Sequence, residues 1–558
     1  MSQFDAIMIG SGITGGWAAK ELTEAGLKVL LLERGRMIEH GSGYTRETLA
    51  PWELPFRGEG DAALYAKEFA VQSKNRQFNE WTQDHFVNDV DNPYTTPDDF
   101  TWWRSYQLGG RSLTWGRQCY RWSDYDFGAN AADGNGVDWP IRYADLAPWY
   151  DKVEAFIGVS GAAEGLAQLP DGQFQPPMAL NVVEAHARQV IGDKWPERRL
   201  TIGRTANLTE AKDGRTKCQY RSICARGCSY GAYFSTQSST LPAAQKTGNL
   251  TLVTDAIVEG IEHDPASGRA SGVRVLGAKD GKRTTYTARL IFLNAGAFNS
   301  NHLLLRSASA AFPHGLANSS GQLGLRIMDH ANTLSTAALI PGFEDRTTYG
   351  NRPTGIVIPR FRNLGRDEGL GFTRGYSYQG GALQSGWTAA KREPGIGADF
   401  KAKHRKVGPW RMVLVTYAES IPRDSNRLTL NRAETDRWGA PVLDIAFAHG
   451  ENEHKALADA KAQASAMMEA LGGTVLFGFD QPGSGGSSIH EMGGMGMSDD
   501  PKRAVLNAHS QAHDVKNLFV ADGAQMNSSA CQNPSLTYMA LTARAANKAV
   551  GMLKEGAL

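Results

Sequence analysis

The chain has 558 residues, of which 41% are hydrophobic and 21% are charged, as in an ordinary soluble globular protein. Lys and Arg total 59 against 58 for Asp and Glu, and this net charge of +1 excludes the basic excess expected of a protein that binds nucleic acid or an anionic membrane. No stretch approaches the roughly 18 apolar residues of a membrane-spanning helix. The length exceeds what one hydrophobic core serves, so we expect two closely joined domains.

The first residues, MSQFDAIMIGSG, contain no basic segment, apolar core or cleavage site of a signal peptide. We therefore expect the chain to fold in the cytoplasm. Export to the periplasm beside a partner that carries a signal remains open.

The opening of the chain predicts a strand, a helix and a second strand. Residues 4–9 form an apolar run, residues 13–25 have helical spacing, and residues 28–32 are almost wholly apolar. Continuous apolar strands on either side of a helix indicate a buried parallel sheet. Residues 36–100 are polar, aromatic and rich in turns, which is typical of a lid or a loop that covers a cofactor.

The middle of the chain shows other patterns than the strand–helix units at its two ends. The sequence predicts a helix after a Pro stop at residues 138–159, strands at 250–261 and 288–294, and an antiparallel sheet at 411–444. It then predicts an amphipathic helix at 451–471, a buried strand at 517–522 and a closing helix at 534–552. This order suggests a nucleotide-binding domain assembled from separated segments, with a substrate domain inserted between them.

The first turn carries a dinucleotide fingerprint, Gly10-Ser11-Gly12-Ile13-Thr14-Gly15. Gly10 permits the tight turn, Gly12 lets a pyrophosphate approach the backbone, and Gly15 lets the helix pack closely. Glu33 ends the second strand, where a carboxylate can hold ribose hydroxyls, and Arg34 follows it. The alternative is a glycine-rich turn without a ligand. The fingerprint alone does not distinguish FAD from NAD.

Several further segments resemble the glucose–methanol–choline (GMC) oxidoreductases, which are FAD enzymes. The resemblance covers most of the chain outside residues 36–100 and 340–410. It rests on the fingerprint and on the segments Leu108-Gly109-Gly110-Arg111-Ser112, Asp138-Trp139-Pro140-Ile141, Asn294 to Ser300, Met328-Asp329-His330, and His490 through Asn517 to Gly523 and Gln532-Asn533-Pro534.

The resemblance implies an α/β fold, α+β overall, in which a Rossmann-like FAD-binding domain carries an inserted substrate-binding domain built on an antiparallel sheet with helices. We assign residues 1–135, 200–330 and 482–558 to the FAD-binding domain and residues 136–199 and 331–481 to the substrate-binding domain. Beyond the fingerprint, the implied FAD contacts are Gly109, Gly110, Ser112, Thr114, Ala256, Val258, Ala295, Gly296, Asp522, Gly523, Asn533, Pro534 and Ser535.

Some family members join a histidine covalently to the flavin. Thr114 stands at the position that we align with that histidine. Because a threonine hydroxyl cannot substitute in this linkage, we expect FAD to be bound non-covalently.

Two residues near the C-terminus are predicted to carry the chemistry. Oxidation of an alcohol needs a base for the hydroxyl proton, and a histidine with a pKa near neutrality suits that task. His490, flanked by glycines, matches the family's catalytic histidine, and Asn533 matches the position that can hold the alkoxide-like oxygen. A structural histidine and a helix N-cap are the alternatives. His330 either lines the site or anchors a loop, and His513 is interpreted as structural.

Three of the five cysteines, Cys218, Cys224 and Cys228, lie within eleven residues. Zinc would need a fourth ligand, which no Cys-x₂-Cys pair or nearby histidine supplies, so an iron–sulfur cluster is the better interpretation. Three ligands suit a three-iron, four-sulfide (3Fe-4S) cluster, while a four-iron cluster with another ligand stays open. A disulfide with a free thiol, or three buried thiols, are the alternatives.

The cysteine spacing resembles that of bacterial FAD-dependent glucose and glucoside dehydrogenases of the same family. The resemblance implies one-electron transfer to a cytochrome c subunit or a quinone, and a small companion subunit that carries the export signal. An oxidase that uses oxygen would need no such relay.

The expected reaction is oxidation of a glycoside at the secondary hydroxyl of ring carbon 3. Oxidation of free glucose at carbon 1, of a polyol or of gluconate, and a sugar oxidase, are rival predictions. An inactive FAD-binding subunit that only transfers electrons is an alternative of another class, against which His490 and Asn533 speak.

Overall fold

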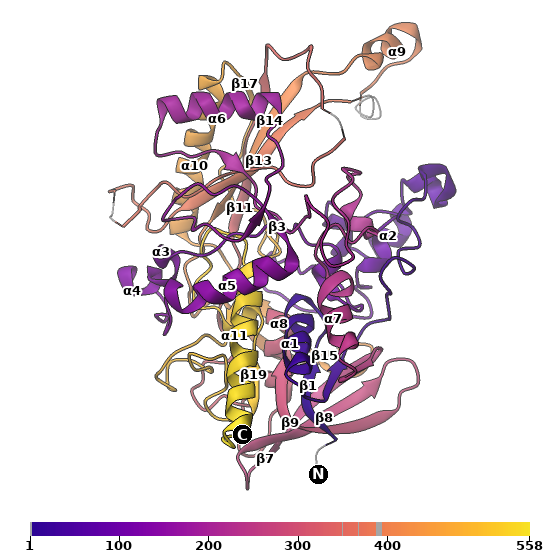
Figure 1. Cartoon of the computed structure of the whole chain (residues 1–558), viewed down its shortest axis with the longest axis vertical. Helices are drawn as coiled ribbons and strands as arrows, with labels where there is room; N and C mark the ends of the chain where they lie inside the picture. Colours follow the sequence, from indigo (N-terminus) through magenta and orange to yellow (C-terminus); the bar gives the residue numbers. More distant parts are fainter. Residues whose placement is uncertain (1–2, 349, 366–367, 387–392) are drawn as a thin grey trace.

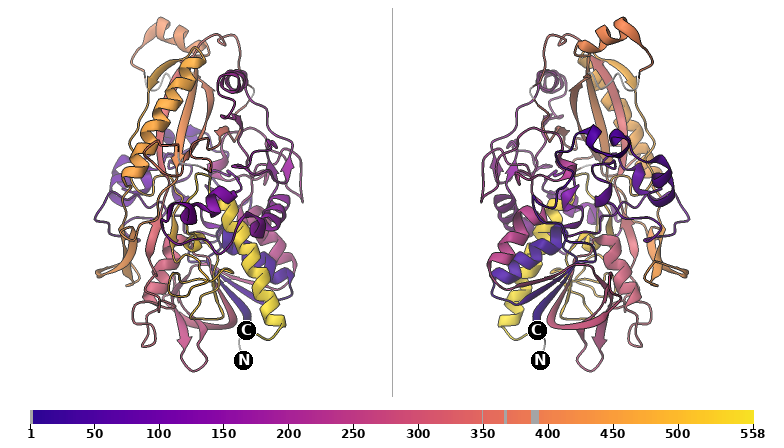
Figure 2. Two further views of the ribbon diagram at one scale, coloured as in Figure 1. Left: turned by 90° about the vertical axis from the view of Figure 1, so that its left-hand side faces the viewer. Right: turned by 90° about the vertical axis from the view of Figure 1, so that its right-hand side faces the viewer.

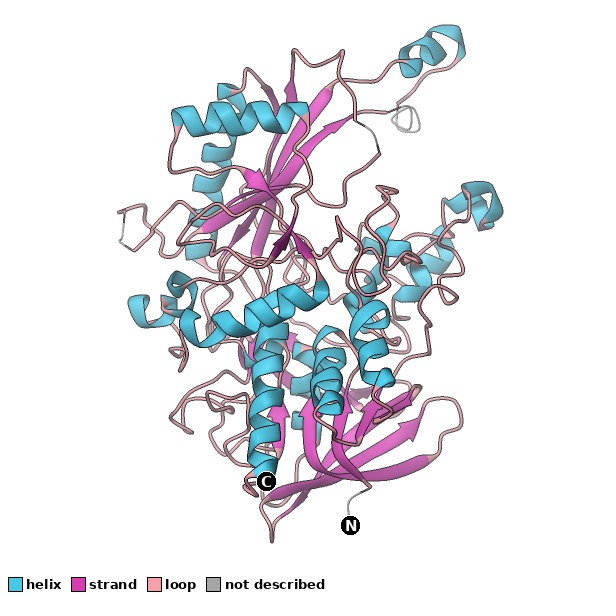
Figure 3. Cartoon of the chain, viewed as in Figure 1, coloured by secondary structure: helices cyan, strands magenta, loops and turns pink. Residues whose placement is uncertain are grey.

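The computed structural model describes residues 3–348, 350–365, 368–386 and 393–558. Two strand-rich regions lie at opposite ends of an elongated molecule, with a loop-rich zone between them (Figures 1 and 3). Both chain termini lie beside the first region (Figure 1).

The first region is built on a seven-stranded sheet with the order β6-β2-β1-β9-β8-β7, in which β19 also pairs with β9. The parallel part of this sheet consists of β1, β2, β6, β9 and β19. An antiparallel extension follows, in which β8 pairs with β9 and β7 pairs with β8. The strands are β1 (Phe4–Ile9), β2 (Val29–Leu32), β6 (Leu250–Val253), β7 (Ala256–Asp264), β8 (Arg269–Gly277), β9 (Arg283–Leu293) and β19 (Leu518–Val520).

Helices cover this sheet because its central strands are apolar on both faces. All four residues of β2, VLLL, are buried, which leaves no polar face for solvent. α1 (Ile13–Glu24) packs against α11 (Ser535–Lys554) and α7 (Leu241–Lys246). The side views show α1 and α11 running beside the parallel strands (Figure 2).

The second region is a six-stranded antiparallel sheet with the order β17-β11-β14-β13-β12-β5. α10 (Glu451–Ala470) packs on β11 and β14, and α6 (Val182–Lys194) contacts α10 and β13 (Figure 1). The strands are β5 (Thr201–Ile202), β11 (Ala331–Ile340), β12 (Ile356–Ile358), β13 (Tyr376–Gln384), β14 (Trp410–Ala418) and β17 (Thr474–Phe477).

A four-stranded sheet, β16-β15-β10-β18, completes the framework. Its strands are β10 (Leu325–Met328), β15 (Arg427–Thr435), β16 (Pro441–Ala446) and β18 (Met492–Gly494). The remaining elements are α2 (Ala62–Glu68), α3 (Asp124–Phe127), α4 (Ala129–Asp133), α5 (Tyr143–Ile157), α8 (Ala297–Arg306), α9 (Gly397–Arg405), β3 (Val159–Ser160) and β4 (Phe174–Gln175), with short helices at Pro51–Glu53, Pro55–Gly58, Gln72–Lys74, Gln83–His85, Gly110–Leu113, Cys224–Arg226, Thr236–Thr240 and Gly523–Gln525.

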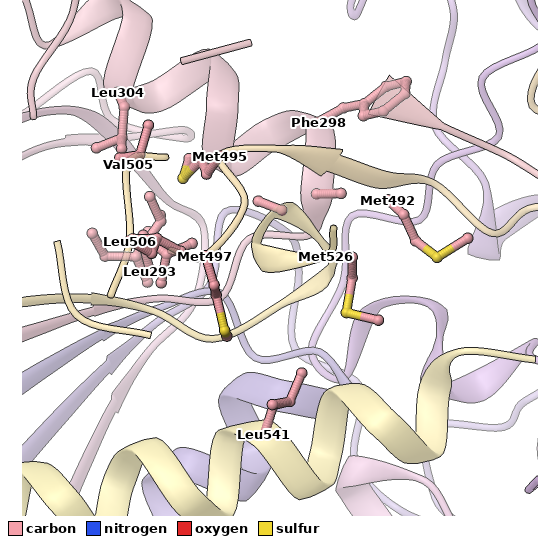
Figure 4. Packing of buried hydrophobic residues seen from close by; sticks show 14 of the residues in the cluster. Leu293, Phe298, Leu304, Met492, Met495, Met497, Val505, Leu506, Met526 and Leu541 are labelled. Atoms are coloured by element: carbon pink, nitrogen blue, oxygen red, sulfur yellow. The ribbon is translucent and has the colours of Figure 1, made fainter. Parts of the chain in front are cut away.

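Methionines fill the core beside the C-terminal segment. Met492, Met495, Met497 and Met526 are buried, and their side chains lie between α8 and α11 (Figure 4). Flexible thioethers fill irregular gaps between elements. These methionines belong to the same apolar cluster as Leu293 of β9 and Val520 of β19.

The α/β fold class predicted from the sequence is confirmed by this arrangement. The apolar run at 250–261 forms two strands, because Asp255 between them has a φ of 54°. Residues 36–100 form short helices, turns and three isolated β-bridges, at Arg36, Thr95 and Phe100, which agrees with the expected irregular segment.

The domain boundaries stay a prediction. α5 contacts α11, and its Leu146 and Val153 belong to the same apolar cluster as Ile7 of β1. β5, in contrast, pairs with β12 of the second sheet. The segments around residues 136–202 therefore contribute to both regions.

In the part of the chain that the structure describes, we find no helix with the length and apolar character needed to span a membrane.

Candidate active site

One large cavity of about 660 Å³ lies between the first sheet and the second. Its walls come from the carboxyl ends of β1, β2 and β9, from the first turn of α11, and from β13 and β14. Ligands of open parallel sheets bind beyond the carboxyl ends of the strands, and the volume falls within the usual range of cofactor sites.

The glycine fingerprint shapes one end of this cavity. Gly10 has a φ of +96°, and a Cβ there would lie 2.6 Å from the carbonyl oxygen of Asn294, so only glycine fits the turn. A Cβ on Gly15 would collide with the carbonyl oxygen of Gly10, whereas a Cβ on Gly12 would meet no protein atom within 4 Å. Gly12 therefore faces the open space in which a pyrophosphate belongs.

The neighbouring groups fit a flavin dinucleotide. α1 begins at Ile13 without a side-chain cap, so its free N–H groups and positive dipole end face the cavity. Glu33 lines the cavity and accepts hydrogen bonds from Ser11 Oγ at 2.5 Å and from the Gly35 amide at 2.8 Å. Burial raises the pKa of Glu33. The buried amide of Asn294 also lines the cavity and has no partner within the described residues.

Most residues predicted to bind the cofactor line this one cavity. They are Gly10, Gly12, Ile13, Thr14, Glu33, Arg34, Gly110, Ser112, Thr114, Ala256, Val258, Ala295, Gly296, Asp522, Gly523, Asn533, Pro534 and Ser535. Gly15 and Gly109 instead stand behind the wall, against the Gly10 carbonyl and the Gln237 amide. Their role is to allow close packing.

The geometry of Gly12 yields a specific prediction. Gly12→Ala should leave the folding of the apoprotein unchanged, because its methyl group would contact no protein atom, but should weaken FAD binding by about 1–3 kcal/mol, the usual cost of overpacking. Flavin titration and thermal melts of the apoprotein measure the two effects. Gly551→Ala in α11, another position with free space around it, is the matched control and should bind FAD normally. Equal FAD affinity in both variants would contradict this account.

The predicted catalytic pair lies on the cavity wall. The Nδ2 atom of Asn533 is 3.0 Å from Nε2 of His490. Burial, followed by the nearby His330 and Arg111, lowers the pKa of His490 well below its ordinary value, so the imidazole is neutral at neutral pH. A neutral ring can accept a proton.

The closing helix begins one residue later than predicted. α11 starts at Ser535, Pro534 is its N-cap residue, and Asn533 precedes the cap. Asn533 therefore does not cap the helix, and its amide is free to face His490. The first turn of α11 also lines the cavity and directs its positive dipole end there.

Several site residues escaped the sequence analysis. Gln379 of β13 donates from Nε2 to Asn533 Oδ1 at 2.6 Å, and Tyr417 of β14 lies with its ring 5.8 Å from that of His490. Arg111 pairs with Glu491 at 2.8 Å. Each of these side chains lines the cavity. Glu491 follows His490 directly, and this adjacency could have identified it. Gln379 and Tyr417 lie on strands that contain other polar residues, so no local pattern marks them.

His330 is fully buried, and its Nδ1 atom lies 2.8 Å from Nδ1 of His490. His513 lies elsewhere, with Nε2 3.0 Å from the carbonyl oxygen of Ser498. Its interpretation as a structural histidine agrees with this contact.

The three clustered cysteines line a separate small cavity. All five cysteines of the chain are free thiols. Burial, together with Cys224 and Cys228 nearby, raises the pKa of Cys218. Among the residues that the structure describes, no group of three or more His, Cys, Asp or Glu side chains could hold a metal ion.

The loop that carries these cysteines has a defined conformation. Tyr220 and Ser222 have positive φ values of 55° and 60°, which non-glycine residues adopt only where the surroundings enforce them. The Tyr220 amide donates to Cys218 Sγ at 3.4 Å, and the Arg221 guanidinium lies 3.9 Å from Cys228 Sγ. Two nitrogen donors of this loop therefore face the sulfur atoms of Cys218 and Cys228.

Comparison with known proteins agrees with the site. The two parts of the family description "GMC oxidoreductase" match residues 4–332 and 422–542. The 2-methyl-1,2-propanediol dehydrogenase of Mycolicibacterium austroafricanum is 27% identical over 97% of this chain and 94% of its own length. The fructose dehydrogenase large subunit of Gluconobacter japonicus is 25% identical over 99% and 98%.

The fold also matches solved structures. A variant of the formate oxidase of Aspergillus oryzae, studied for its FAD modification, superimposes with a TM-score of 0.62 at 15% identity over all of both chains. The chain belongs to the GMC oxidoreductase family and is an FAD-dependent oxidoreductase that acts on the CH–OH group of a sugar or an alcohol.

Proposed function

We propose that this protein is a sugar dehydrogenase that oxidises the secondary hydroxyl at carbon 3 of a glycoside to a ketone and passes the electrons to an acceptor other than oxygen. The observation that supports oxidation of a hydroxyl group is the pair His490–Asn533, a neutral base and an amide donor 3.0 Å apart on the wall of the cofactor cavity.

The reaction divides between the cofactor and the chain. Bound FAD supplies the acceptor for the hydride of the substrate carbon. His490 Nε2 takes the hydroxyl proton, so the O–H and C–H bonds break as the C=O bond forms. Asn533 Nδ2 donates a hydrogen bond to the same oxygen and stabilises its developing negative charge.

The substrate end of the cavity suits a ring with several hydroxyl groups. Asn332, Gln379 and Tyr417 line it beside the catalytic pair and supply amide groups and an aromatic face. The relatives with known substrates include a diol dehydrogenase and the large subunit of a fructose dehydrogenase, and both substrates carry vicinal hydroxyl groups.

FAD is held without a covalent bond in this proposal. Thr114 lines the cavity at the position of the family's flavin-linked histidine, and its hydroxyl forms no such link.

Cys218, Cys224 and Cys228 would hold an iron–sulfur cluster of the 3Fe-4S type, which would supply a one-electron acceptor near the surface. Support comes from the shared cavity and from the two donors aimed at the sulfurs.

The acceptor is a cytochrome c or a quinone. A small companion subunit carries the export signal, so the chain folds in the cytoplasm and is exported with that subunit. The name "large subunit" of the fructose dehydrogenase relative supports such a companion.

Methyl α-D-glucopyranoside tests the position of oxidation, because its carbon 1 is blocked. Anaerobic addition should bleach the flavin and yield the 3-keto product, which NMR identifies. The 3-deoxy analogue is the matched control and should leave the flavin oxidised. Bleaching by free glucose alone, or by the 3-deoxy analogue, would contradict oxidation at carbon 3.

A further inference from the structure

Two histidines from distant parts of the chain meet beside the cavity. His330 lies between β10 and β11, and His490 lies just before β18. Their Nδ1 atoms are 2.8 Å apart, and their rings are nearly perpendicular, at 85°. Two hydrogen atoms cannot occupy so short a contact, so one of the two Nδ1 atoms must be an acceptor.

A backbone carbonyl decides which one it is. His330 Nε2 lies 3.0 Å from the carbonyl oxygen of Ala530, which can only accept a hydrogen bond. His330 therefore carries its hydrogen on Nε2. Burial lowers the pKa of His330 to about 4, so the ring is neutral at neutral pH and its Nδ1 holds a lone pair.

The hydrogen of His490 follows from this assignment. Because His330 Nδ1 accepts, His490 Nδ1 must donate, and a neutral His490 then has its lone pair on Nε2. That atom is the one that faces Asn533, at 3.0 Å.

The hydrogen bonds on the Asn533 side of His490 are consistent with this assignment. Gln379 Nε2 donates to Asn533 Oδ1 at 2.6 Å, which leaves the Asn533 NH₂ group to donate to His490 Nε2. Every link from Gln379 to Ala530 then joins one donor to one acceptor. The side-chain amides and rings have a single consistent assignment because the last acceptor is a carbonyl oxygen.

We infer that His330 is a positioning residue that holds His490 in the tautomer with hydrogen on Nδ1. Nε2 of His490 is then the base, and it acts on the same substrate oxygen as the Asn533 amide. This inference rests on the proposed function. When the hydroxyl proton moves to Nε2, His490 becomes an imidazolium whose Nδ1–H bond to the neutral His330 remains in place. The acceptor lone pair of His330 thus stabilises the charge that forms.

The surrounding backbone is built to keep this contact. Ala530 and Ile489, which present the carbonyl and the His490 ring, have positive φ values of 53° and 64°. Asp329, directly before His330, accepts from Ser488 Oγ and from the His490 amide, the latter at 3.0 Å. Strained non-glycine conformations cluster where function requires a fixed geometry.

Other charged groups face the pair. Arg111, which is paired with Glu491, also lowers the pKa of His490, and burial raises the pKa of Asp329 to about 7. Neither group contacts a ring nitrogen of His490, so neither sets its tautomer.

Two substitutions test the inference. His330→Phe retains an aromatic ring but no acceptor, and should lower kcat by about 10–100-fold, the usual cost of losing an orienting partner, with little change in KM. His330→Asn places an amide oxygen where Nδ1 stands and should restore much of kcat. If His330 had only a structural role, kcat would depend on the shape of the side chain, and His330→Phe would retain more activity than His330→Asn.

The tautomer itself is read by ¹⁵N NMR of histidine-labelled protein without substrate, with His490→Gln used to assign the signal. The wild type should show hydrogen on Nδ1 and a bare Nε2 at His490, and His330→Phe should show a mixture. Hydrogen on Nε2 in the wild type, or an unchanged signal in His330→Phe, would overturn the inference. This readout needs no substrate, so it stands apart from the proposed function, which fails if no sugar reduces the wild-type flavin.

Discussion

Replacing His490 with glutamine should lower the rate of flavin reduction by substrate by about 10²–10⁴-fold, the usual contribution of a general base. Glutamine retains a polar side chain at the cavity wall but cannot accept the hydroxyl proton. FAD content should remain that of the wild type, because His490 is not part of the glycine turn. Stopped-flow absorbance of the flavin under anaerobic conditions measures the rate.

His513→Gln is the matched control for this experiment. His513 also contacts a backbone carbonyl, that of Ser498, but lies outside the lining of the cavity. Its variant should reduce the flavin at the wild-type rate. If His490→Gln kept that rate as well, His490 could not be the base.

Changing Cys218, Cys224 and Cys228 together to serine should remove all cluster iron and the associated electron paramagnetic resonance signal. Reduction of the flavin by substrate should continue, because the cysteines line a different cavity from the catalytic pair. Transfer to a one-electron acceptor such as cytochrome c should fall sharply. Iron analysis, resonance spectra and cytochrome reduction measure these effects.

Cys119→Ala provides the comparison, since Cys119 is a buried thiol outside the cysteine loop. Its variant should retain the iron and the acceptor activity. Anaerobically prepared wild-type protein without iron, or a triple variant that still reduces cytochrome c normally, would contradict the proposed relay.

The parts of the fold and site that depend on short segments were predictable. The glycine turn, Glu33 and the first three elements lie within 33 consecutive residues, and their spacing alone specifies a strand, a turn, a helix and a strand. The closing helix was predicted within two residues at either end, because Pro534 and an apolar periodicity define it.

The contacts of the catalytic pair were beyond sequence reasoning. His330 and His490 are separated by 160 positions. The carbonyl oxygen that accepts from His330, and from which the hydrogen positions of both rings are inferred, belongs to Ala530. Gln379 of β13 and Asn533, which precedes α11, are separated by 154 positions. Such contacts depend on how three sheets are placed relative to each other, which no local pattern records.

In the proposed reaction, hydride leaves carbon 3 of a glycoside for the flavin while His490 takes the proton. The most direct measurement is anaerobic flavin bleaching with methyl α-D-glucopyranoside that carries deuterium at carbon 3, compared with the same sugar deuterated at carbon 2. We predict a primary isotope effect on the bleaching rate for carbon 3 and none for carbon 2. An isotope effect at carbon 2, or a flavin that stays oxidised, would contradict the account.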